Sequence, residues 1–236
     1  MRRILVALLC LSFFTLMIGQ DRCNCETIDT IKTTQAYLHF KDSENVVCKT
    51  YFLVEQFNFN LKSKKFQEAE KQILLAIDLF KKTKCEESIR VSLLKKLDNV
   101  LNHQSKFDES LKVNMSLRAH FEKVRDSTNL VKSILQLAKI YDRMGLKDQK
   151  WSKIKEVRLL IPRLKDDEEK LILWARLAQL TLHEYQDTKE KKYLNEFETL
   201  CNELKILSLI IKPSRKTQFL INTRLASLHI YKEEWE

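Results

Sequence analysis

The sequence predicts an all-α protein built as a solenoid of stacked antiparallel helical hairpins. Glycine and proline are scarce, with only two residues of each in 236. Residues that favour helices dominate, and no stretch shows the apolar and polar alternation, bounded by turn residues, that is typical of strands. Apolar residues also recur at a fixed period, because the steps from Leu97 to Leu137 and from Leu137 to Leu177 are both 40 residues. A fixed period of this length indicates a series of similar helical units.

The segment from Val131 to Pro162 is the clearest single hairpin. Each half carries apolar residues three and four positions apart, which is the spacing of one helix face. Gly145 separates the halves and favours a helix end there, whereas Pro162 cannot continue a helix because it has no amide hydrogen. The apolar positions are Ile134, Leu137, Ala138 and Tyr141 in the first half and Trp151, Ile154, Val157 and Ile161 in the second.

Two earlier segments share a turn motif in which an aromatic, an acidic and a small residue follow the turn in the same order. These residues are Phe66, Glu68 and Ala69, and then Phe107, Glu109 and Ser110. The aromatic residue can wedge between two helices, and the small residue lets the helices approach closely. In the hairpin that starts at Val131, Lys150 takes the place of the small residue. We expect Lys150 to lie on the solvated face of its helix with Lys147, Lys153 and Lys155.

These motifs resemble the tetratricopeptide repeat (TPR), whose pattern places small, aromatic and closing proline residues in the same order. The resemblance spans about residues 45–231. It implies a right-handed superhelix whose concave face is lined by the first helix of each pair. The 40-residue period exceeds the 34 residues typical of the family, so we expect helices longer by about a turn. Helical pairs of the HEAT type and an unrelated helical bundle remain open as alternatives.

The chain divides into three segments. Residues 1–20 have the layout of a signal peptide, with Arg2 and Arg3 before an apolar run. Residues 21–44 form a lead-in segment with a short helix, and residues 45–236 form the TPR-like repeat domain. We expect hairpins at about 45–84, 86–125, 127–163 and 166–212, and a final helix at 214–233. A last copy of the repeat at Leu225 follows Leu177 by 48 residues, which predicts an extra helical turn or a longer loop near residues 185–192.

The N-terminal segment predicts export to the periplasm or the cell exterior. The alternative is a membrane anchor formed by residues 4–19, although this run is short for a membrane span. Loss of residues 1–20 would leave five cysteines, so at least one thiol would stay unpaired in a compartment that permits disulfides. Cys48 and Cys85 lie at the same end of the first expected hairpin and are the preferred pair, with Cys25 competing for Cys48.

The concave face that the resemblance implies is polar and basic. Lysine and asparagine side chains can hold a peptide carboxylate or backbone. The basic balance of the chain is consistent with an acidic peptide, with an anionic surface or simply with solubility. The candidate binding residues are Asn58, Lys95, Asn99, Asn102, Lys139, Arg143, Arg176 and Gln179. We therefore expect non-catalytic binding of a protein or peptide outside the cytoplasm, with no nucleic acid as partner. The alternative is a sensory or scaffolding segment of a membrane-associated bacterial signalling protein.

Catalytic, metal and cofactor sites are not expected. A P-loop, a dinucleotide fingerprint and a G-x-S-x-G elbow each need several glycines close together, and Gly19 and Gly145 cannot supply them. The histidines lie on separate expected helices, and the sequence has no H-E-x-x-H pair that could hold zinc. The chain is therefore expected not to be an enzyme and to need no small-molecule cofactor.

Overall fold

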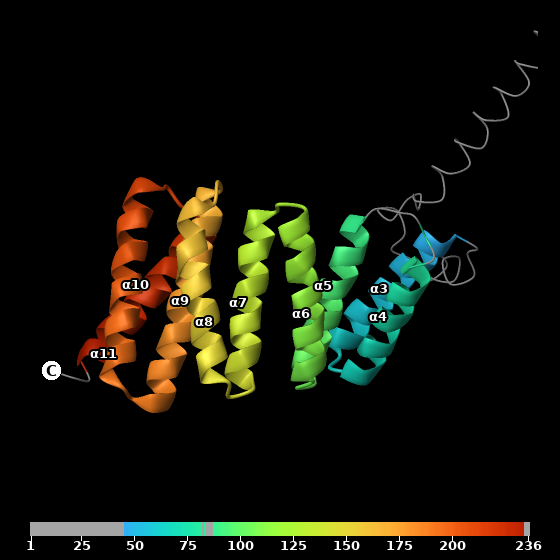
Figure 1. Ribbon diagram of the computed structural model, residues 1–236, viewed down its shortest axis with the longest axis horizontal. Coiled ribbons are helices and arrows are strands. Elements are labelled where there is room, and N and C mark those ends of the chain that lie inside the picture. The colour runs from blue at the N-terminus through green and yellow to red at the C-terminus, as the bar shows by residue number, and fades with distance from the viewer. Residues whose placement is uncertain (1–44, 82, 84–86, 234–236) are drawn as a thin grey trace, which may run out of the picture. The chain divides into compact units, whose positions relative to one another are not determined.

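A computed structural model describes residues 45–81, 83 and 87–233 (Figure 1). Of these residues, 88% are helical and none lies in a strand. The helices pack neighbour to neighbour in adjacent pairs, which confirms the predicted all-α, solenoid-like class. The chain divides into two compact units, unit 1 (Met1–Val113) and unit 2 (Asn114–Glu236). The expected signal peptide and lead-in helix, at 1–20 and 21–44, lie outside the described residues.

Unit 1 holds one complete hairpin and part of the next. α3 (Val46–Lys62) packs against α4 (Phe66–Lys81), and α5 (Glu87–His103) packs on α4. α6 (Phe107–Lys123) begins in unit 1 and ends in unit 2. The side chain of Asn45 caps α3, because its Oδ1 accepts a hydrogen bond from the amide of Val47 at 2.9 Å. The core of the unit includes Phe57, Ala69, Ile73, Phe80, Leu97 and Val100.

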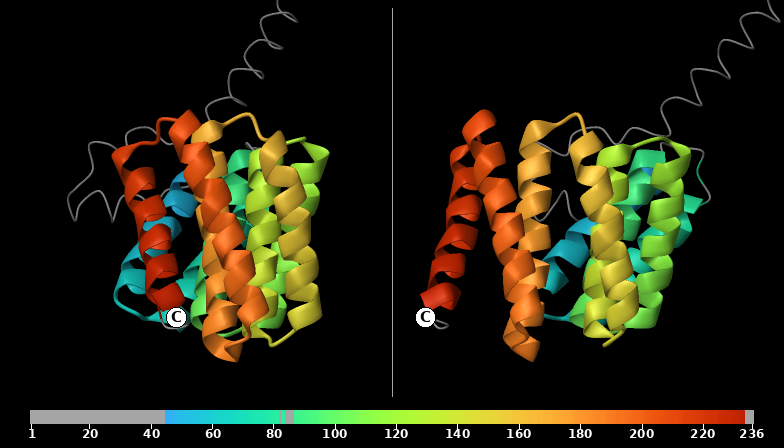
Figure 2. Two further views of the ribbon diagram at one scale, coloured as in Figure 1. Left: turned by 90° about the vertical axis from the view of Figure 1, so that its left-hand side faces the viewer. Right: turned by 60° about the vertical axis from the view of Figure 1, so that its left-hand side comes forward.

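Unit 2 contains two further hairpins and a last helix (Figure 2). α7 (Ser127–Arg143) pairs with α8 (Lys147–Leu160), which continues into the short 3-10 helix η2 (Ile161–Arg163). α9 (Asp167–Thr188) pairs with α10 (Lys191–Ile210), and α11 (Arg215–Glu233) packs on both. α9 has 22 residues against 17 in α7, so the extra turn that the long last step predicts lies at least partly in α9.

The turns inside the first three hairpins share one backbone geometry. Lys64, Ser105 and Gly145 have positive φ angles of 57°, 58° and 73°. The next residue in each turn donates its amide to the carbonyl five positions earlier, namely Lys65 to Asn60, Lys106 to Leu101 and Leu146 to Tyr141, at 2.8, 3.0 and 2.9 Å. This hydrogen bond defines the Schellman ending of a helix. The turns are 41 and 40 residues apart, so the period in the sequence is also a period in the backbone.

The position of the small residue in the turn motif is buried in each hairpin that the structure describes. Its occupants are Ala69, Ser110, Lys150 and Leu194. In the second hairpin the Ser110 hydroxyl donates to Asp98 Oδ1 on α5 at 2.5 Å and accepts a hydrogen bond from the Asn102 amide at 2.7 Å. Ser110 therefore contacts the first helix of its own hairpin.

Lys150 corrects the expectation that the lysines of α8 are solvated, because its side chain is fully buried. Its Nζ lies 2.6 Å from Asp142 Oδ1 on α7 and 2.5 Å from Glu184 Oε2 on α9. A buried ammonium without a partner would be costly, and the two carboxylates offset that cost. Helical periodicity within α8 does not reveal these partners, since one of them belongs to the next hairpin.

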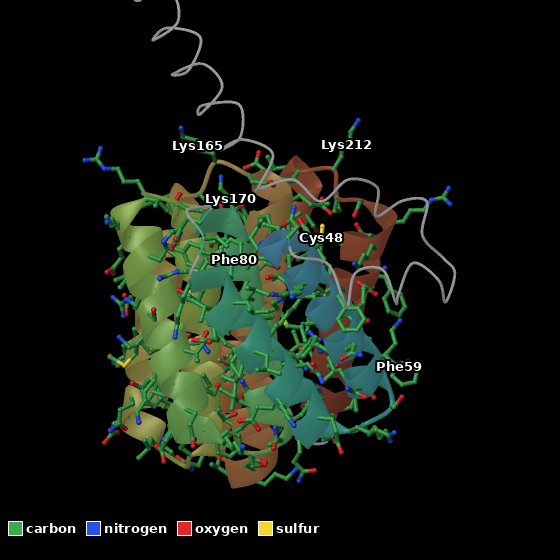
Figure 3. All side chains as sticks on the ribbon, turned by 90° about the vertical axis from the view of Figure 1, so that its right-hand side faces the viewer. Cys48, Phe59, Phe80, Lys165, Lys170 and Lys212 are labelled. Atoms are coloured by element: carbon green, nitrogen blue, oxygen red, sulfur yellow. The ribbon has the colours of Figure 1, made fainter. Side chains whose placement is uncertain are left out.

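The cysteines of the described residues have different roles. Cys48 is disulfide-bonded and lies near the start of α3 (Figure 3). Cys85 and Cys25 lie outside the described residues, so the pairing of Cys48 with Cys85 remains a prediction. Cys201 on α10 is a free, buried thiol, and burial raises its pKa to about 12.

Candidate functional site

Four of the predicted binding residues lie in unit 2, on the first helices of two neighbouring hairpins. Lys139 and Arg143 lie one turn apart on α7, and Arg176 and Gln179 lie one turn apart on α9. Spacings of four and three residues place the members of each pair on the same helix face. α7 also packs against α9. The packing of first helix on first helix therefore joins the two pairs into one surface.

The cations of this surface influence one another. Lys139 is half-buried, and its burial lowers the pKa of its ammonium below the ordinary value. The positive charges of Arg176 and Arg143 lower this pKa further. No carboxylate of the described residues opposes this effect at Lys139. Such a group of like charges costs stability, and groups of this kind are frequent at sites that bind anions.

α11 contributes a further cation, Arg224. Its Nη2 donates a hydrogen bond to Gln179 Oε1 at 2.9 Å, so the two side chains fix each other's positions. Arg224 is half-buried, and burial lowers the pKa of its guanidinium. Its Nε has no hydrogen-bond partner among the described residues. We name Lys139, Arg143, Arg176, Gln179 and Arg224 the basic face.

Arg224 was not among the residues predicted from the sequence, although the repeat contains the signal for it. Arg224 precedes Leu225 and Ala226 as Arg176 precedes Leu177 and Ala178. The two arginines therefore occupy the same position of successive first helices. Aligning the last copy of the repeat on the fourth hairpin would have placed Arg224 on the same surface.

The other four predicted residues belong to unit 1. Asn58 on α3 accepts a hydrogen bond from Lys96 Nζ at 3.3 Å and donates one to Glu55 Oε1 at 3.2 Å. Lys95 and Asn99 lie on α5 and are exposed. Lys95 and Asn99 have the exposure that a binding role needs, whereas the hydrogen bonds of Asn58 also fit a role within the unit.

Asn102 has a structural role in the α5–α6 hairpin. Its Nδ2 donates hydrogen bonds to Asp98 Oδ1 at 2.8 Å and to Ser110 Oγ at 2.7 Å. Both acceptors are buried. The amide donor that was predicted to bind a peptide is therefore used to join the two helices of this hairpin.

A hollow of about 400 Å³ lies between α10 and α11. Leu225 and Leu228 line it together with charged residues of both signs, and a salt bridge of 2.6 Å joins Lys232 to Glu198 there. The hollow thus carries charges of both signs, whereas the charged side chains of the basic face are all positive. Within the residues that the structure describes, no cluster of histidine, cysteine and acidic side chains is suited to hold a metal ion.

No protein-family model and no curated protein matches the chain. Over residues 45–81, 83 and 87–233, no helix is both long enough and apolar enough to cross a membrane.

Proposed function

We propose that this chain is a non-catalytic, TPR-like binding module that holds an acidic segment of a protein or peptide on the basic face, outside the cytoplasm. The observation that carries this proposal is the convergence of Lys139, Arg176 and Arg224 from α7, α9 and α11 onto one surface. No salt bridge joins these three cations to a carboxylate of the described residues. An acidic segment would supply the missing negative charge.

The side chains of the basic face suit a carboxylate ligand. An arginine guanidinium can donate two parallel hydrogen bonds to one carboxylate, and a lysine acts as a compact positive charge. Gln179 is already bonded to Arg224 at 2.9 Å. This contact holds one guanidinium in place before a ligand arrives, and preorganisation of this kind reduces the cost of binding.

The repeated turn geometry supports the TPR-like part of the proposal. Lys64, Ser105 and Gly145 end the first helix of their hairpins in the same conformation, and the first helices of unit 2 carry the basic face. The positive net charge of the chain would also attract an acidic partner before contact. We therefore expect binding that weakens as the salt concentration rises.

The proposal is tested with peptides rich in aspartate and glutamate, by fluorescence anisotropy of a labelled peptide against the full chain. Arg176→Gln with Arg224→Gln is expected to weaken binding by at least about tenfold, because each lost charged hydrogen bond contributes about 1.5–3 kcal/mol. The matched control is Lys165→Gln with Lys212→Gln, which removes the same charge from exposed side chains at one end of unit 2 (Figure 3). Equal losses in the two double variants would show only a general charge effect and would overturn the proposal.

The pH dependence of binding gives an independent test. The pKa of Lys139 is lowered by burial and by the charges of Arg176 and Arg143. A bound carboxylate would favour the charged ammonium, so binding is expected to weaken as the pH rises through this lowered pKa. Lys139→Arg keeps the charge at alkaline pH and should remove the decline, whereas a decline that persists unchanged in this variant would assign it to another group.

A further inference from the structure

α11 exposes one complete side of its surface. Phe219 and Ile230 are 76% and 58% exposed, and Thr223 and Ala226 between them are also exposed. Their spacings of three and four residues put them on one stripe along the helix. Figure 2 shows α11 at the edge of unit 2, with α10 on one side and no further helix of unit 2 on the other. Apolar side chains therefore lie on a helix face that no described helix of unit 2 covers.

The same positions are buried in the two preceding first helices. Counting back 48 residues from Phe219, Thr223 and Ala226 gives Leu171, Ala175 and Ala178 on α9, and each of these is fully buried. Counting back 88 residues gives Val131, Leu135 and Ala138 on α7, which are buried to a similar extent. α7 is paired with α8 and α9 with α10. The exposed stripe of α11 therefore corresponds to a face that is covered in the first helices of the two complete hairpins of unit 2.

The stripe is complementary to itself when it is reversed. Phe219 and Ile230 lie at equal distances in sequence from its middle, as do the small residues Thr223 and Ala226. The exposed ends carry opposite charges, with Lys216 near the start and Glu233 near the finish. In an antiparallel pair of identical helices, Phe219 would meet Ile230 of the other copy, and Lys216 would meet Glu233. Two-fold symmetry produces both contacts twice.

We propose that the exposed stripe of α11 is a homodimer interface, in which the α11 helices of two copies pack antiparallel about Thr223 and Ala226. The hydroxyl of Thr223 donates to the carbonyl of Phe219 at 2.8 Å, so it needs no partner across the interface. The neighbouring Ser227 is satisfied in the same way by the carbonyl of Thr223, at 2.9 Å. Small side chains at the centre allow the two helices to approach closely.

The interface and the basic face lie on different sides of α11. Arg224 is five residues after Phe219, which is a rotation of about 140° around the helix axis. A dimer formed through the stripe therefore leaves Arg224 with Gln179 on its own copy. Each dimer would present two basic faces, which would strengthen binding to a partner that carries two acidic segments.

Sedimentation velocity of the full chain across a concentration series tests the proposal. The wild-type chain is expected to form a dimer, and Phe219→Glu is expected to raise the dissociation constant at least about tenfold, because it buries a charge at both ends of the symmetric interface. The matched control is Leu159→Glu on α8, which changes an apolar residue of similar exposure (69%) away from the stripe. A wild-type chain that remains monomeric, or a Phe219→Glu variant that dimerises as tightly as wild type, would overturn the proposal.

A charge exchange tests the antiparallel register. Lys216→Glu or Glu233→Lys alone places like charges opposite each other in both symmetric pairs and should weaken the dimer about tenfold. Combining the two substitutions restores opposite charges and should return the affinity close to that of wild type. A parallel arrangement would place Lys216 opposite Lys216 of the second copy, and the double variant would then show no rescue of either single variant.

Discussion

The Nζ atom of Lys150 lies 2.5 Å from Glu184 Oε2, and solvent reaches 0% of the lysine side chain and 3% of the glutamate side chain. The contact joins α8 to α9 and thus links two successive hairpins of unit 2. Asp142 at 2.6 Å and Lys147, whose Nζ lies 3.0 Å from Glu184 Oε1, complete a group of two positive and two negative side chains. Lys150 occupies the position that Ala69 and Ser110 fill in the first two hairpins. The third hairpin thus replaces close packing by an ion-pair network.

Replacing Lys150 should destabilise the protein strongly. Lys150→Ala leaves the buried carboxylate of Glu184 without its closest partner and opens a cavity, and breaking a buried pair in this way costs about 3–5 kcal/mol. The free energy of unfolding, measured by urea denaturation, should fall by this amount with little change in the slope of the transition.

The control for this prediction is Lys155→Ala, because Lys155 is an exposed lysine on the same helix. Its substitution should change the free energy of unfolding by less than about 0.5 kcal/mol. Similar losses in the two variants would mean that the contacts of Lys150 contribute no more than an ordinary surface lysine.

Glu184 should make stability depend on acid pH. Burial acts to raise the pKa of this carboxyl, but hydrogen bonds and positive charges from Lys150 and Lys147 outweigh burial and hold the pKa below its ordinary value. A lowered pKa in the folded state means that the contribution is complete above the unfolded pKa of about 4.3 and is lost as the pH falls through the folded pKa. Glu184→Gln should therefore be less stable than wild type at neutral pH, and the difference should shrink in acid. A difference that stays constant down to acid unfolding would contradict the assignment.

The sequence was sufficient to predict the fold class. The features that indicate this class are the scarcity of glycine, the helical spacing of apolar residues and the 40-residue period, and each of them can be recognised within single hairpins and their turns. Gly145, for example, has the left-handed conformation that its place between two apolar stripes predicts. Lys150 was misplaced because Glu184, one of its two carboxylate partners, lies 34 residues away on another helix. Periodicity assigns a residue to a face of its own helix, but the sequence alone does not show which neighbour covers that face.

The candidate site was likewise predicted from the sequence only in part. Lys139, Arg143, Arg176 and Gln179 were predicted from the inner face that the resemblance implies, and the structure groups them on α7 and α9. Asn102 looked equally suitable in sequence, but its amide bonds Ser110 across the hairpin. Whether a polar side chain is available to a ligand depends on the residue opposite, which only the folded chain specifies.

The basic face should cost stability in the absence of a ligand. Lys139→Met removes a charge that burial and the nearby Arg176 and Arg143 disfavour, as the lowered pKa of Lys139 indicates. We expect this variant to be more stable than wild type by roughly 0.5–2 kcal/mol, the usual range for relieving unfavourable charges. Thermal unfolding at low and high salt provides the measurement, and the gain should be smaller at high salt because salt screens the repulsion. A loss of stability at both salt concentrations would show that Lys139 has a packing role instead.

The left-handed turns predict that glycine is the favoured residue at Ser105 as it is at Gly145, in contrast to a position inside a helix. Ser105 has a φ of 58°, a conformation that costs a residue with a side chain about 1–2 kcal/mol. Ser105→Gly removes this cost but makes the unfolded chain more flexible, so we expect a net gain of about 0.5 kcal/mol. Gly145→Ala should lose about 1 kcal/mol through its φ of 73° alone, because no atom lies within 4 Å of the added Cβ.

Ser92→Gly, at an exposed position inside α5, is the control and should destabilise by up to about 1 kcal/mol. Urea denaturation of the three variants measures these differences, and a loss in Ser105→Gly as large as that in Ser92→Gly would show that the left-handed conformation carries no cost in this turn.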